Sequence, residues 1–454
     1  MDTIAAPATP PGRGGIGIVR VCGPRAAAIA AALLGRVPNP RRATLSAFLD
    51  AAGEPIDAGI ALFFPGPASF TGEDVLELHG HGGPVVMQLL MARVVELGAR
   101  PARPGEFTER AFFAGKVDLA QAEAVADLIE AGSAQAARAA MRSLQGEFSR
   151  EVESLATAVT ELRVYVEAAI DFPDEDVEFL GSAEVAGRLA DIEGRFDRVG
   201  HAAAQGRLLR DGLHVVIAGK PNAGKSSLLN RLAGHEAAIV TETPGTTRDV
   251  LRERIDIDGL PLHVVDTAGL RETDDVVEGE GVRRARAEIA RADLVLYLAD
   301  ATQAPSPASL RAELEALPAG VPVLLAWNKA DLMEGVAGQS YFKGENATAA
   351  SSPALVISAR TGFGLDELRA RLKERAGYEQ GGTGAFSARA RHVEALGRAR
   401  AHFERARDML AARSSFELVA EELRLGHDAL GEITGAVSSD DLLGRIFGSF
   451  CIGK

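Results

Sequence analysis

The sequence is poor in cysteine, in aromatic residues and in long apolar runs. Its 454 residues include only Cys22 and Cys451, and two cysteines cannot build a disulfide framework, so we expect a reducing compartment. No apolar run approaches the roughly 18 residues of a membrane span, and residues 1–15 lack the basic and apolar segments of a secretory signal. Aromatic residues make up 5% of the chain, so Ala, Leu and Val must form most of its cores. We therefore expect a cytoplasmic protein that does not contact a membrane.

Positive charge is also scarce, because the formal net charge is −14. Binding to nucleic acid over a broad surface requires dense Lys and Arg, so this balance argues against such a surface but permits a local patch. Residues 387–413 are the candidate, with arginines that outnumber the acidic residues. We interpret this stretch as a solvated helix face with ion pairs, and keep a nucleic-acid patch as the alternative.

The pattern of apolar residues divides the chain into four segments. Residues 1–118 mix short apolar runs with Gly and Pro, which predicts an α+β domain. Residues 119–210 are Ala-rich with helical spacing, residues 211–376 alternate strands with helices, and residues 377–454 are helical again. Because domains with neighbouring termini tolerate insertion into a host, we predict a discontinuous helical domain that carries an inserted α/β domain.

The strongest motif is Gly219-x-x-x-x-Gly224-Lys225-Ser226, which follows the apolar strand 214–218 and opens a helix. The glycines let several backbone N–H groups point at phosphate oxygens. Lys225 is expected to reach the β- and γ-phosphates, and the Ser226 hydroxyl is expected to bind Mg²⁺. The order of strand, loop and helix therefore predicts a phosphate-binding loop.

Three further elements indicate a guanine nucleotide. Asp266-x-x-Gly269 ends a strand, where the carboxylate can hold Mg²⁺ through water and the Gly269 N–H can meet the γ-phosphate. Asp331, in Asn328-Lys329-x-Asp331, can accept hydrogen bonds from both the ring N–H and the exocyclic amine of guanine, and adenine does not offer this pair of donors. With Ser358-Ala359-Arg360 as the last base-contacting loop, these elements predict a Ras-like GTPase domain. The residues assigned to GTP, including the switch segment, are Asn222, Ala223, Gly224, Lys225, Ser226, Ser227, Thr241, Glu242, Thr243, Pro244, Gly245, Thr246, Thr247, Asp266, Thr267, Ala268, Gly269, Asn328, Lys329, Ala330, Asp331, Ser358, Ala359 and Arg360.

Two parts of the Ras-like hydrolysis machinery are missing from the sequence. Leu270 stands where a glutamine would position the attacking water, and leucine cannot form a hydrogen bond. No arginine finger is identifiable within the domain. The acidic stretch downstream offers Glu272, Glu278 and Glu280 to orient water, and residues 238–250 supply several oxygen ligands for a cation.

Two patterns in the first domain are weaker. Gly12-x-Gly14-x-x-Gly17 matches a dinucleotide fingerprint by its letters, but it precedes its strand, so we predict a flexible loop instead. His79 and His81 suggest a metal pair, but no cysteine or third histidine is nearby in sequence. The glycines around them predict a tight turn before the next helix.

Cys451 lies in the terminal sequence "FCIGK", and its role is open between lipid anchor, nucleophile, redox sensor and buried small hydrophobe. A prenylation frame would end on Lys454, an unusual residue at that position, which disfavours the anchor. Reactivity of the thiol depends on its pKa, which the sequence does not give.

Stretches along the whole chain resemble one family. The stretches are "GKPNAGKSSLLN", "TPGTTRD", "DTAGLRETDDVVEGEG" and "CIGK", together with "TPPGRGGIGIVRVCG", "FTGEDVLELHGHGG" and "RPGEFTERAFFAGKVDLAQAEAVADLI" in the first domain. They look like the bacterial tRNA-modification GTPases of the MnmE (TrmE) type, and the inserted-domain order is the same. The resemblance implies a homodimer whose first domain binds 5-formyltetrahydrofolate, or methylene-tetrahydrofolate, and mediates dimerisation.

The resemblance also implies an activity. Such a protein, with an FAD- and NADH-using partner of the GidA type in a heterotetramer, adds a carboxymethylaminomethyl or aminomethyl group to carbon 5 of the wobble uridine of certain tRNAs. The one-carbon unit comes from the folate. GTP hydrolysis is activated by K⁺ when two G domains pair, and the cation stands where an arginine finger would.

Specific residues follow from the resemblance alone. Glu278 matches the glutamate that orients water, Thr247 matches a Mg²⁺ ligand beside Ser226, and Cys451 becomes a candidate catalytic thiol. The residues that match K⁺ ligands are Asn222, Thr241, Thr243 and Thr246. The residues that match folate ligands are Arg20, Glu77, Lys116 and Lys454. Two alternative classes stay open: an assembly switch such as a ribosome-maturation GTPase, and a scaffold whose G domain orders a partner that does the chemistry.

Overall fold

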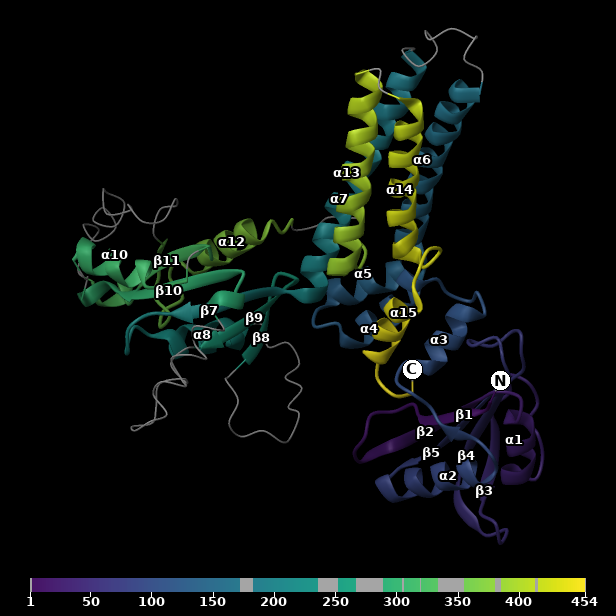
Figure 1. Cartoon of the computed structure of the whole chain (residues 1–454). Helices are drawn as coiled ribbons and strands as arrows, with labels where there is room; N and C mark the ends of the chain where they lie inside the picture. Colours follow the sequence, from purple (N-terminus) through teal and green to yellow (C-terminus); the bar gives the residue numbers. More distant parts are fainter. Residues whose placement is uncertain are drawn as a thin grey trace. The chain divides into compact units, whose positions relative to one another are not determined.

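The structure is a computed structural model that describes residues 2–171, 183–235, 252–266, 289–303, 306–318, 320–333, 355–379, 385–412 and 415–453. The chain forms two compact units (Figure 1). Unit 1 comprises Met1–Ala126, Leu144–Ile192 and Arg398–Lys454, and unit 2 comprises Asp127–Ser143 and Glu193–Gly397.

Unit 1 begins with a six-stranded sheet in the order β3-β4-β5-β2-β1-β6. All of its pairings are antiparallel except that of β1 with β6. Alternate side chains of the strands point to opposite faces, so Val19 and Val21 join one apolar cluster with α1 and α2, whereas Cys22 joins another with Phe107 of α3. The elements are β1 (Ile4–Pro7), β2 (Gly14–Cys22), α1 (Ala26–Leu34), β3 (Thr44–Leu49), β4 (Pro55–Phe64), β5 (Val75–Gly82), α2 (Pro84–Glu96), β6 (Arg100–Pro101) and α3 (Glu106–Phe113).

Two predictions for this sheet are wrong. Gly14 and Gly17 lie inside β2, with a register irregularity between them, so the flexible loop is instead the irregular start of a strand. His79 and His81 lie inside β5 rather than in a turn, and each ring contacts a carboxylate. Nε2 of His79 is 3.1 Å from Glu77, and Nδ1 of His81 is 2.8 Å from Asp57. The backbones of β2 and β5 approach closely here, because a Cβ on Gly82 would lie 2.7 Å from the carbonyl oxygen of Gly14. This close approach explains the glycine at that position.

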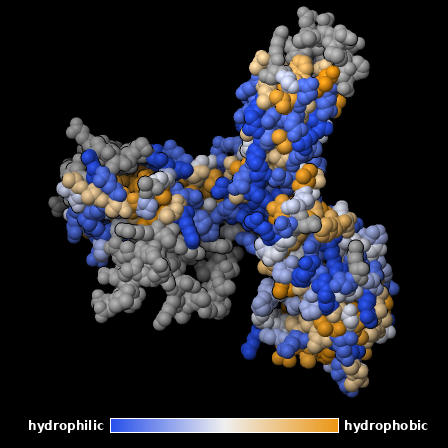
Figure 2. Space-filling view, in the orientation of Figure 1, coloured by the Kyte–Doolittle hydropathy of each residue, from blue (hydrophilic) through white to orange (hydrophobic). Residues whose placement is uncertain are grey.

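The Ala-rich segments of the chain form helices, as the spacing of their apolar residues predicts. In α6 the buried residues Leu155, Val159, Leu162 and Val166 recur at helical spacing, and α14 packs beside this helix. Figure 2 shows mainly hydrophilic residues on the visible face of these helices. The helices are α4 (Leu119–Glu130), α5 (Ala134–Leu144), α6 (Glu147–Asp171), α7 (Ala183–Asp211), α13 (Ala390–Ala411), α14 (Phe416–Thr434) and α15 (Asp440–Gly448). Within the described residues, no helix has the length and apolar character that a membrane span requires.

The arginine-rich stretch forms α13, and carboxylates neutralise much of it. Arg398 and Arg405 pair with Glu432 and Glu422 of α14, and Arg400 pairs with a glutamate of its own helix. The ion-pair interpretation is therefore confirmed, although several partners belong to the neighbouring helix. This arrangement gives no support to a nucleic-acid patch.

Unit 2 contains a second six-stranded sheet, in the order β12-β11-β10-β7-β9-β8. It is parallel apart from the β8–β9 hairpin. Both faces are buried, with α8 and α12 against one face and α10 against the other, as expected for a doubly covered parallel sheet. The elements are β7 (Leu213–Ala218), α8 (Lys225–His235), β8 (Arg252–Ile257), β9 (Leu260–Asp266), β10 (Leu294–Asp300), η2 (Ala301–Gln303), α10 (Pro307–Glu315), β11 (Val323–Asn328), η3 (Ala330–Leu332), β12 (Leu355–Val356) and α12 (Leu365–Ala376).

The main chain of the β8–β9 turn accepts hydrogen bonds from a residue just before α5 and from a residue just after α12. The Ser133 hydroxyl donates to the carbonyl oxygen of Gly259 over 3.2 Å, and the Tyr378 hydroxyl donates to that of Asp258 over 3.3 Å. Gly259 has a φ of 94°, and a Cβ there would fall 0.9 Å from Oε1 of Gln135. The turn therefore requires glycine at this position.

Candidate functional site

The loop between β7 and α8 has the geometry of a phosphate-binding loop. Gly219 (φ 141°) and Gly224 (φ 93°) adopt conformations that favour glycine, and a Cβ on Gly219 would lie 2.1 Å from the carbonyl oxygen of Leu298. The buried Lys225 ammonium donates to the carbonyl oxygens of Gly219 and Lys220 over 2.9 and 3.0 Å. The lysine therefore folds back across the loop, where its charge can meet phosphate oxygens.

Asn328 at the end of β11 ties this loop to the last base-contacting loop. Its buried side-chain amide donates to the carbonyl oxygen of Ala223 over 2.8 Å, and its Oδ1 accepts from the backbone N–H of Ala359 over 2.9 Å. The sequence motif placed Asn328 among the base-contacting residues but did not reveal this bridge, because the partners are main-chain atoms far away in sequence.

The side chain of Asp331 is oriented by its neighbours. Its Oδ1 accepts from the Ser358 hydroxyl over 2.6 Å, and its Oδ2 lies 3.9 Å from Nη1 of Arg360. Lys329 has a φ of 69° and forms an ion pair of 2.6 Å with Asp300. The structure thus brings together the predicted residues of the two base-contacting loops.

Several predicted residues lie outside the described residues, and their roles stay predictions. They are positions 241–247 and 267–269, Glu278 and Lys454. Of the predicted K⁺ ligands, the structure describes Asn222, which is exposed in the phosphate-binding loop with a φ of 63°. Of the Mg²⁺ ligands it describes Ser226, in the first turn of α8, and the backbone of Asp266 ends β9. The loop geometry fits a nucleotide with a bound cation.

Arg20 and Glu77, two of the predicted folate residues, face each other across β2 and β5. Arg20 forms an ion pair of 2.9 Å with Glu77, and its guanidinium also lies over the ring of Phe107. Both residues line a cavity of about 360 Å³, whose mouth is formed by Arg41, Phe64 and Phe70. This volume lies in the range of small-molecule sites. The three residues at the mouth carry no signal in the sequence.

The other folate candidates lie beside this cavity or outside the described residues. Lys116 is exposed, and its Cε lies 3.5 Å from the position that a Cβ of Gly72 would take, in the segment that lines the cavity. Nη1 of Arg20 donates to the carbonyl oxygen of Gly453 over 3.5 Å. The backbone of Gly453 in unit 1 therefore reaches Arg20, and the role of Lys454 stays a prediction.

The two cysteines have different surroundings. Cys451 is exposed, and its carbonyl oxygen accepts from the N–H of Gly105 over 3.4 Å. Cys22 is buried, and its thiol contacts the Thr71 hydroxyl at 3.1 Å and Glu73 at 3.3 Å. Burial raises the pKa of Cys22 to about 12, so this thiol stays protonated and unreactive.

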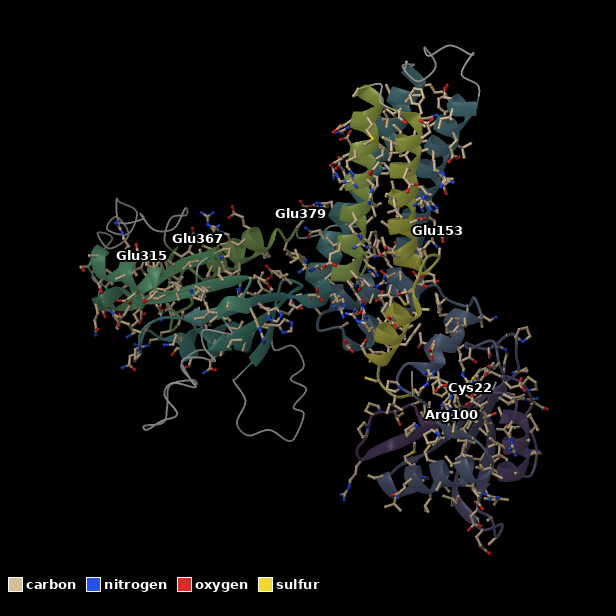
Figure 3. The ribbon with its side chains drawn as sticks, viewed as in Figure 1. Cys22, Arg100, Glu153, Glu315, Glu367 and Glu379 are labelled. Carbon is tan, nitrogen blue, oxygen red and sulfur yellow. The ribbon has the colours of Figure 1, made fainter. Side chains whose placement is uncertain are left out.

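A charged network that no sequence pattern indicates also lies in unit 1. The carboxylate of Glu106 is buried and accepts from Arg100, Arg110 and the N–H of Arg103. Arg110 continues the network to Glu73, at 2.7 Å, and so to Cys22; Cys22 and Arg100 are labelled in Figure 3. Burial alone would raise the pKa of Glu106, but these hydrogen bonds outweigh it and lower the pKa to about 2. The network is linked to the cavity that Arg20 lines, because the thiol of Cys22 contacts Thr71, which also lines that cavity.

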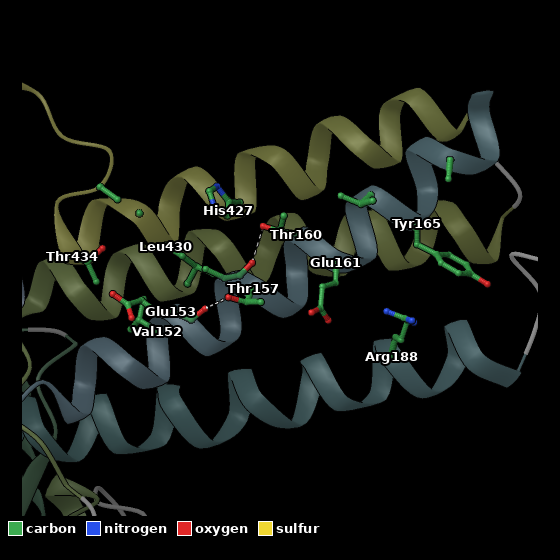
Figure 4. A pocket seen from close by; sticks show the side chains of 15 residues that line it. Val152, Glu153, Thr157, Thr160, Glu161, Tyr165, Arg188, His427, Leu430 and Thr434 are labelled. Atoms are coloured by element: carbon green, nitrogen blue, oxygen red, sulfur yellow. Dashed lines mark hydrogen bonds between the residues drawn. The ribbon is translucent and has the colours of Figure 1, made fainter. Parts of the chain in front are cut away.

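A larger cavity of about 930 Å³ lies among α6, α14 and the start of α7 (Figure 4). Glu153 and Glu161 line it from α6, and Arg188 lines it from α7, where its guanidinium lies over the Tyr165 ring. Its hydroxyls from Thr157 and Thr160 donate to backbone carbonyls of their own helix. None of the predicted site residues lies here. Among the described residues, no group of three or more His, Cys, Asp or Glu side chains could hold a metal ion.

The strand order of unit 2, its phosphate-binding loop and its two base-contacting loops define the class of this domain: it is a Ras-like P-loop GTPase domain. The α+β, helical and inserted G-domain architecture predicted from the sequence is confirmed.

Comparisons with known proteins then give the family. A family model described as "MnmE helical domain" matches residues 119–451, and one described as "GTP-binding protein TrmE N-terminus" matches residues 3–116. A curated relative named "tRNA modification GTPase MnmE" from Stutzerimonas stutzeri (strain A1501) is 59% identical over 100% of this chain and 99% of its own length. A relative of the same name from Sodalis glossinidius is 56% identical over the same shares. The chain belongs to the MnmE (TrmE) family.

The solved structures that resemble part of this chain include one of an isolated G domain. The G domain of the T. maritima FeoB iron transporter is 29% identical and covers 36% of this chain and 98% of its own, with a TM-score of 0.28. The assignment of the fold therefore rests on the strand order and the family, and not on this likeness.

Proposed function

We propose that this chain is a potassium-activated GTPase that takes part in modifying the wobble uridine of certain tRNAs. As a member of a family of tRNA modification GTPases, it is a GTP hydrolase of that class. The finer proposal is that it adds a carboxymethylaminomethyl or aminomethyl group to carbon 5 of the uridine, with an FAD- and NADH-using partner of the GidA type and a folate one-carbon unit. The observation that carries it is the full-length match to proteins of that name, together with an assembled guanine-nucleotide site.

The nucleotide part of the proposal is supported by three contacts. Asn328 joins the phosphate-binding loop to the loop of Ala359. The Ser358 hydroxyl donates to Asp331 and so orients the carboxylate that we assign to guanine. Lys225 donates to the carbonyl oxygen of Gly219, which keeps its ammonium in the loop where the β- and γ-phosphates would bind. Mg²⁺ at Ser226 and Thr247, and K⁺ at Asn222, Thr241, Thr243 and Thr246, would supply the positive charge that an arginine finger supplies in other GTPases. Glu278 would orient the attacking water in place of the missing glutamine.

The cation assignment has a direct test. GTP hydrolysis is measured in K⁺ and in Na⁺ at matched ionic strength, and K⁺ is expected to give the faster rate. Equal rates would remove the cation from the role of an arginine finger. Glu278→Ala is expected to slow hydrolysis while GTP affinity stays close to that of the wild type.

The folate part of the proposal is supported by the chemistry of the cavity in unit 1. A folate presents N–H donors on its pterin and carboxylates on its glutamate tail, and Glu77 and Arg20 are complementary to such groups. Equilibrium binding of 5-formyltetrahydrofolate tests it. An absence of saturable binding, with normal GTP hydrolysis, would favour the assembly switch over an enzyme that uses folate.

The modification chemistry itself is tested on tRNA. Nucleosides of tRNA from a cytoplasmic extract of a strain that lacks this protein are expected to lose the modified wobble uridine, and the wild-type chain is expected to restore it. Cys451→Ser should restore GTP hydrolysis but not the modification, if the exposed thiol is catalytic. Full restoration by the serine variant would leave Cys451 with no chemical role. Homodimerisation and assembly with the GidA-type partner into a heterotetramer are parts of the same proposal, and light scattering of the purified proteins measures both.

A further inference from the structure

The cavity beside Arg20 is lined by a second arginine side chain that has no role in the proposed ligand set. Arg20 is neutralised, because its ion pair with Glu77 is 2.9 Å long. Glu77 is shared further with the ring of His79, at 3.1 Å. The second guanidinium of the cavity belongs to Arg41, in the loop between α1 and β3.

Arg41 is held at the mouth of the cavity by contacts that leave its charge uncompensated. Its guanidinium lies 5.7 Å from the centre of the Phe64 ring and donates to the carbonyl oxygen of Ala68. Among the residues that the structure describes, Arg41 pairs with no carboxylate. A guanidinium has five N–H donors, so most of them remain available to a ligand.

The backbone at Arg41 indicates that this position is fixed by the fold. Its φ is 59°, a left-handed conformation that a non-glycine residue adopts at a cost, and its N–H donates to the carbonyl oxygen of Phe63 over 2.8 Å. The side chain therefore leaves the chain from a set position. Arg42, the next residue, is exposed and does not line the cavity.

The remaining lining is aromatic and apolar. Phe64 and Phe70 contribute rings, and Phe70 is 43% exposed although it is large and apolar. Flat rings of this kind suit a planar or aromatic part of a ligand. A ligand that meets all these groups carries N–H donors for Glu77, an aromatic body for the phenylalanines and an anionic group for Arg41.

We infer that Arg41 is a specificity-determining residue that binds the carboxylate end of the ligand in this cavity. The inference rests on the proposed folate site and extends it: Glu77 and Arg20 bind the pterin, and Arg41 binds a carboxylate of the glutamate tail. A planar fork of donors matches a carboxylate in two parallel hydrogen bonds, which lysine cannot reproduce.

The test compares two probes and two matched variants of the full chain. The probes are 5-formyltetrahydrofolate and 6-methyltetrahydropterin, which has the ring but no glutamate tail. Arg41→Gln keeps a Cβ and a long stem, so it retains the backbone cost at this φ while it removes the charge. Arg42→Gln is the control, because it removes an adjacent exposed arginine. Isothermal titration gives each affinity, and circular dichroism during thermal unfolding shows that each variant is folded.

We expect Arg41→Gln to weaken the folate about tenfold or more, as for the loss of a charge-assisted hydrogen bond, and to leave the affinity for the pterin unchanged. Arg41→Lys should recover only part of the folate affinity, and Arg42→Gln should bind both probes like the wild type. An unchanged folate affinity in Arg41→Gln would overturn the inference and leave the proposed folate site intact. Equal losses for both probes would also overturn it, since Arg41 would then act on the shape of the cavity. A wild-type chain that binds no folate would overturn the folate site and the inference together.

Discussion

The guanidinium of Arg20 donates a hydrogen bond to the carbonyl oxygen of Gly453, although 433 positions separate the two residues. Arg20 also forms the ion pair with Glu77 in the cavity of unit 1. The C-terminal residues therefore take part in fixing a side chain that we assign to ligand binding. Gly453 is buried and has a φ of 98°, and a Cβ on it would lie 2.2 Å from the carbonyl oxygen of Pro7.

Replacing this glycine should weaken folate binding without affecting the G domain. Gly453→Ala must move the chain away from Pro7, so Arg20 loses its contact and we expect roughly a two- to tenfold loss of affinity for 5-formyltetrahydrofolate. Gly448→Ala is the control, because a Cβ at Gly448 meets no atom within 4 Å. Titration of both variants with the folate measures the effect, and GTP turnover should equal that of the wild type. Equal folate affinities for the two variants would contradict a role of the tail in the site.

Removing the bridge at Asn328 should destabilise the G domain and weaken nucleotide binding together. Asn328→Ala leaves the buried carbonyl oxygen of Ala223 and the N–H of Ala359 without their partner, which costs about 1–3 kcal/mol. Asn328→Asp keeps the acceptor but places a carboxylate against a carbonyl oxygen, so we expect it to be the more harmful of the two. Chemical unfolding monitored by Trp327 fluorescence, with and without GTP, measures both effects. Wild-type stability in both variants would show that the bridge is dispensable.

The base specificity of the site should change at Asp331. Asp331→Asn replaces an acceptor-only group by one that also donates, so guanine loses its two charge-assisted hydrogen bonds. Xanthine carries a carbonyl in place of the guanine amine, and this carbonyl can accept a hydrogen bond from the new amide. We expect GTP affinity to fall at least about 100-fold and affinity for xanthosine triphosphate to rise. Competition between the two nucleotides measures the switch. Preserved preference for GTP would mean that Asp331, despite its contact with Ser358, does not read the base.

Acid should loosen the charged network around Glu106. Its pKa is about 2 in the folded chain against an ordinary value of 4.5, so the stability that its ionised form contributes is fully present above pH 4.5 and is lost as the pH falls towards 2. Glu106→Gln should be less stable than the wild type near neutral pH and should lose less stability across that acid range. Glu109→Gln, on the same helix, is the control. Hydrogen exchange of peptides that cover α3, corrected for the intrinsic effect of pH, reports on this region; identical pH profiles for Glu106→Gln and wild type would refute the assignment.

The sequence was sufficient for the features that local patterns encode. Gly219, Gly224 and Lys225 occupy the predicted loop because a phosphate-binding loop is defined by residues close together in the chain. The stripe of Leu155 and Val159 in α6 follows from helical spacing. Neither requires knowledge of distant contacts.

Other features depend on partners that no local pattern identifies. Arg41 is positioned by the ring of Phe64 and by the carbonyl oxygen of Ala68, which are distant in sequence. Asn328 likewise donates to the carbonyl oxygen of Ala223. The glycines around His79 and His81 predict a turn by local pattern, but the close approach of neighbouring strands is what requires glycine there. Long-range pairing in a sheet overrides local turn signals in such cases.

The main-chain contacts of the β8–β9 turn have a consequence for how freely its sequence can vary. Ser133 and Tyr378 recognise carbonyl oxygens of the turn, which every amino acid possesses, so substitutions at Asp258 can alter its charge and still preserve both contacts. Gly259 is constrained by its φ and by the proximity of Gln135, and Asp258 is constrained by its φ of 51° and by its ion pair with Lys373. A hairpin from a distant relative could be grafted here if it keeps glycine at position 259 and a residue that tolerates a left-handed backbone at position 258. The strand β9, whose other end is Asp266, would then remain anchored to Ser133 and Tyr378.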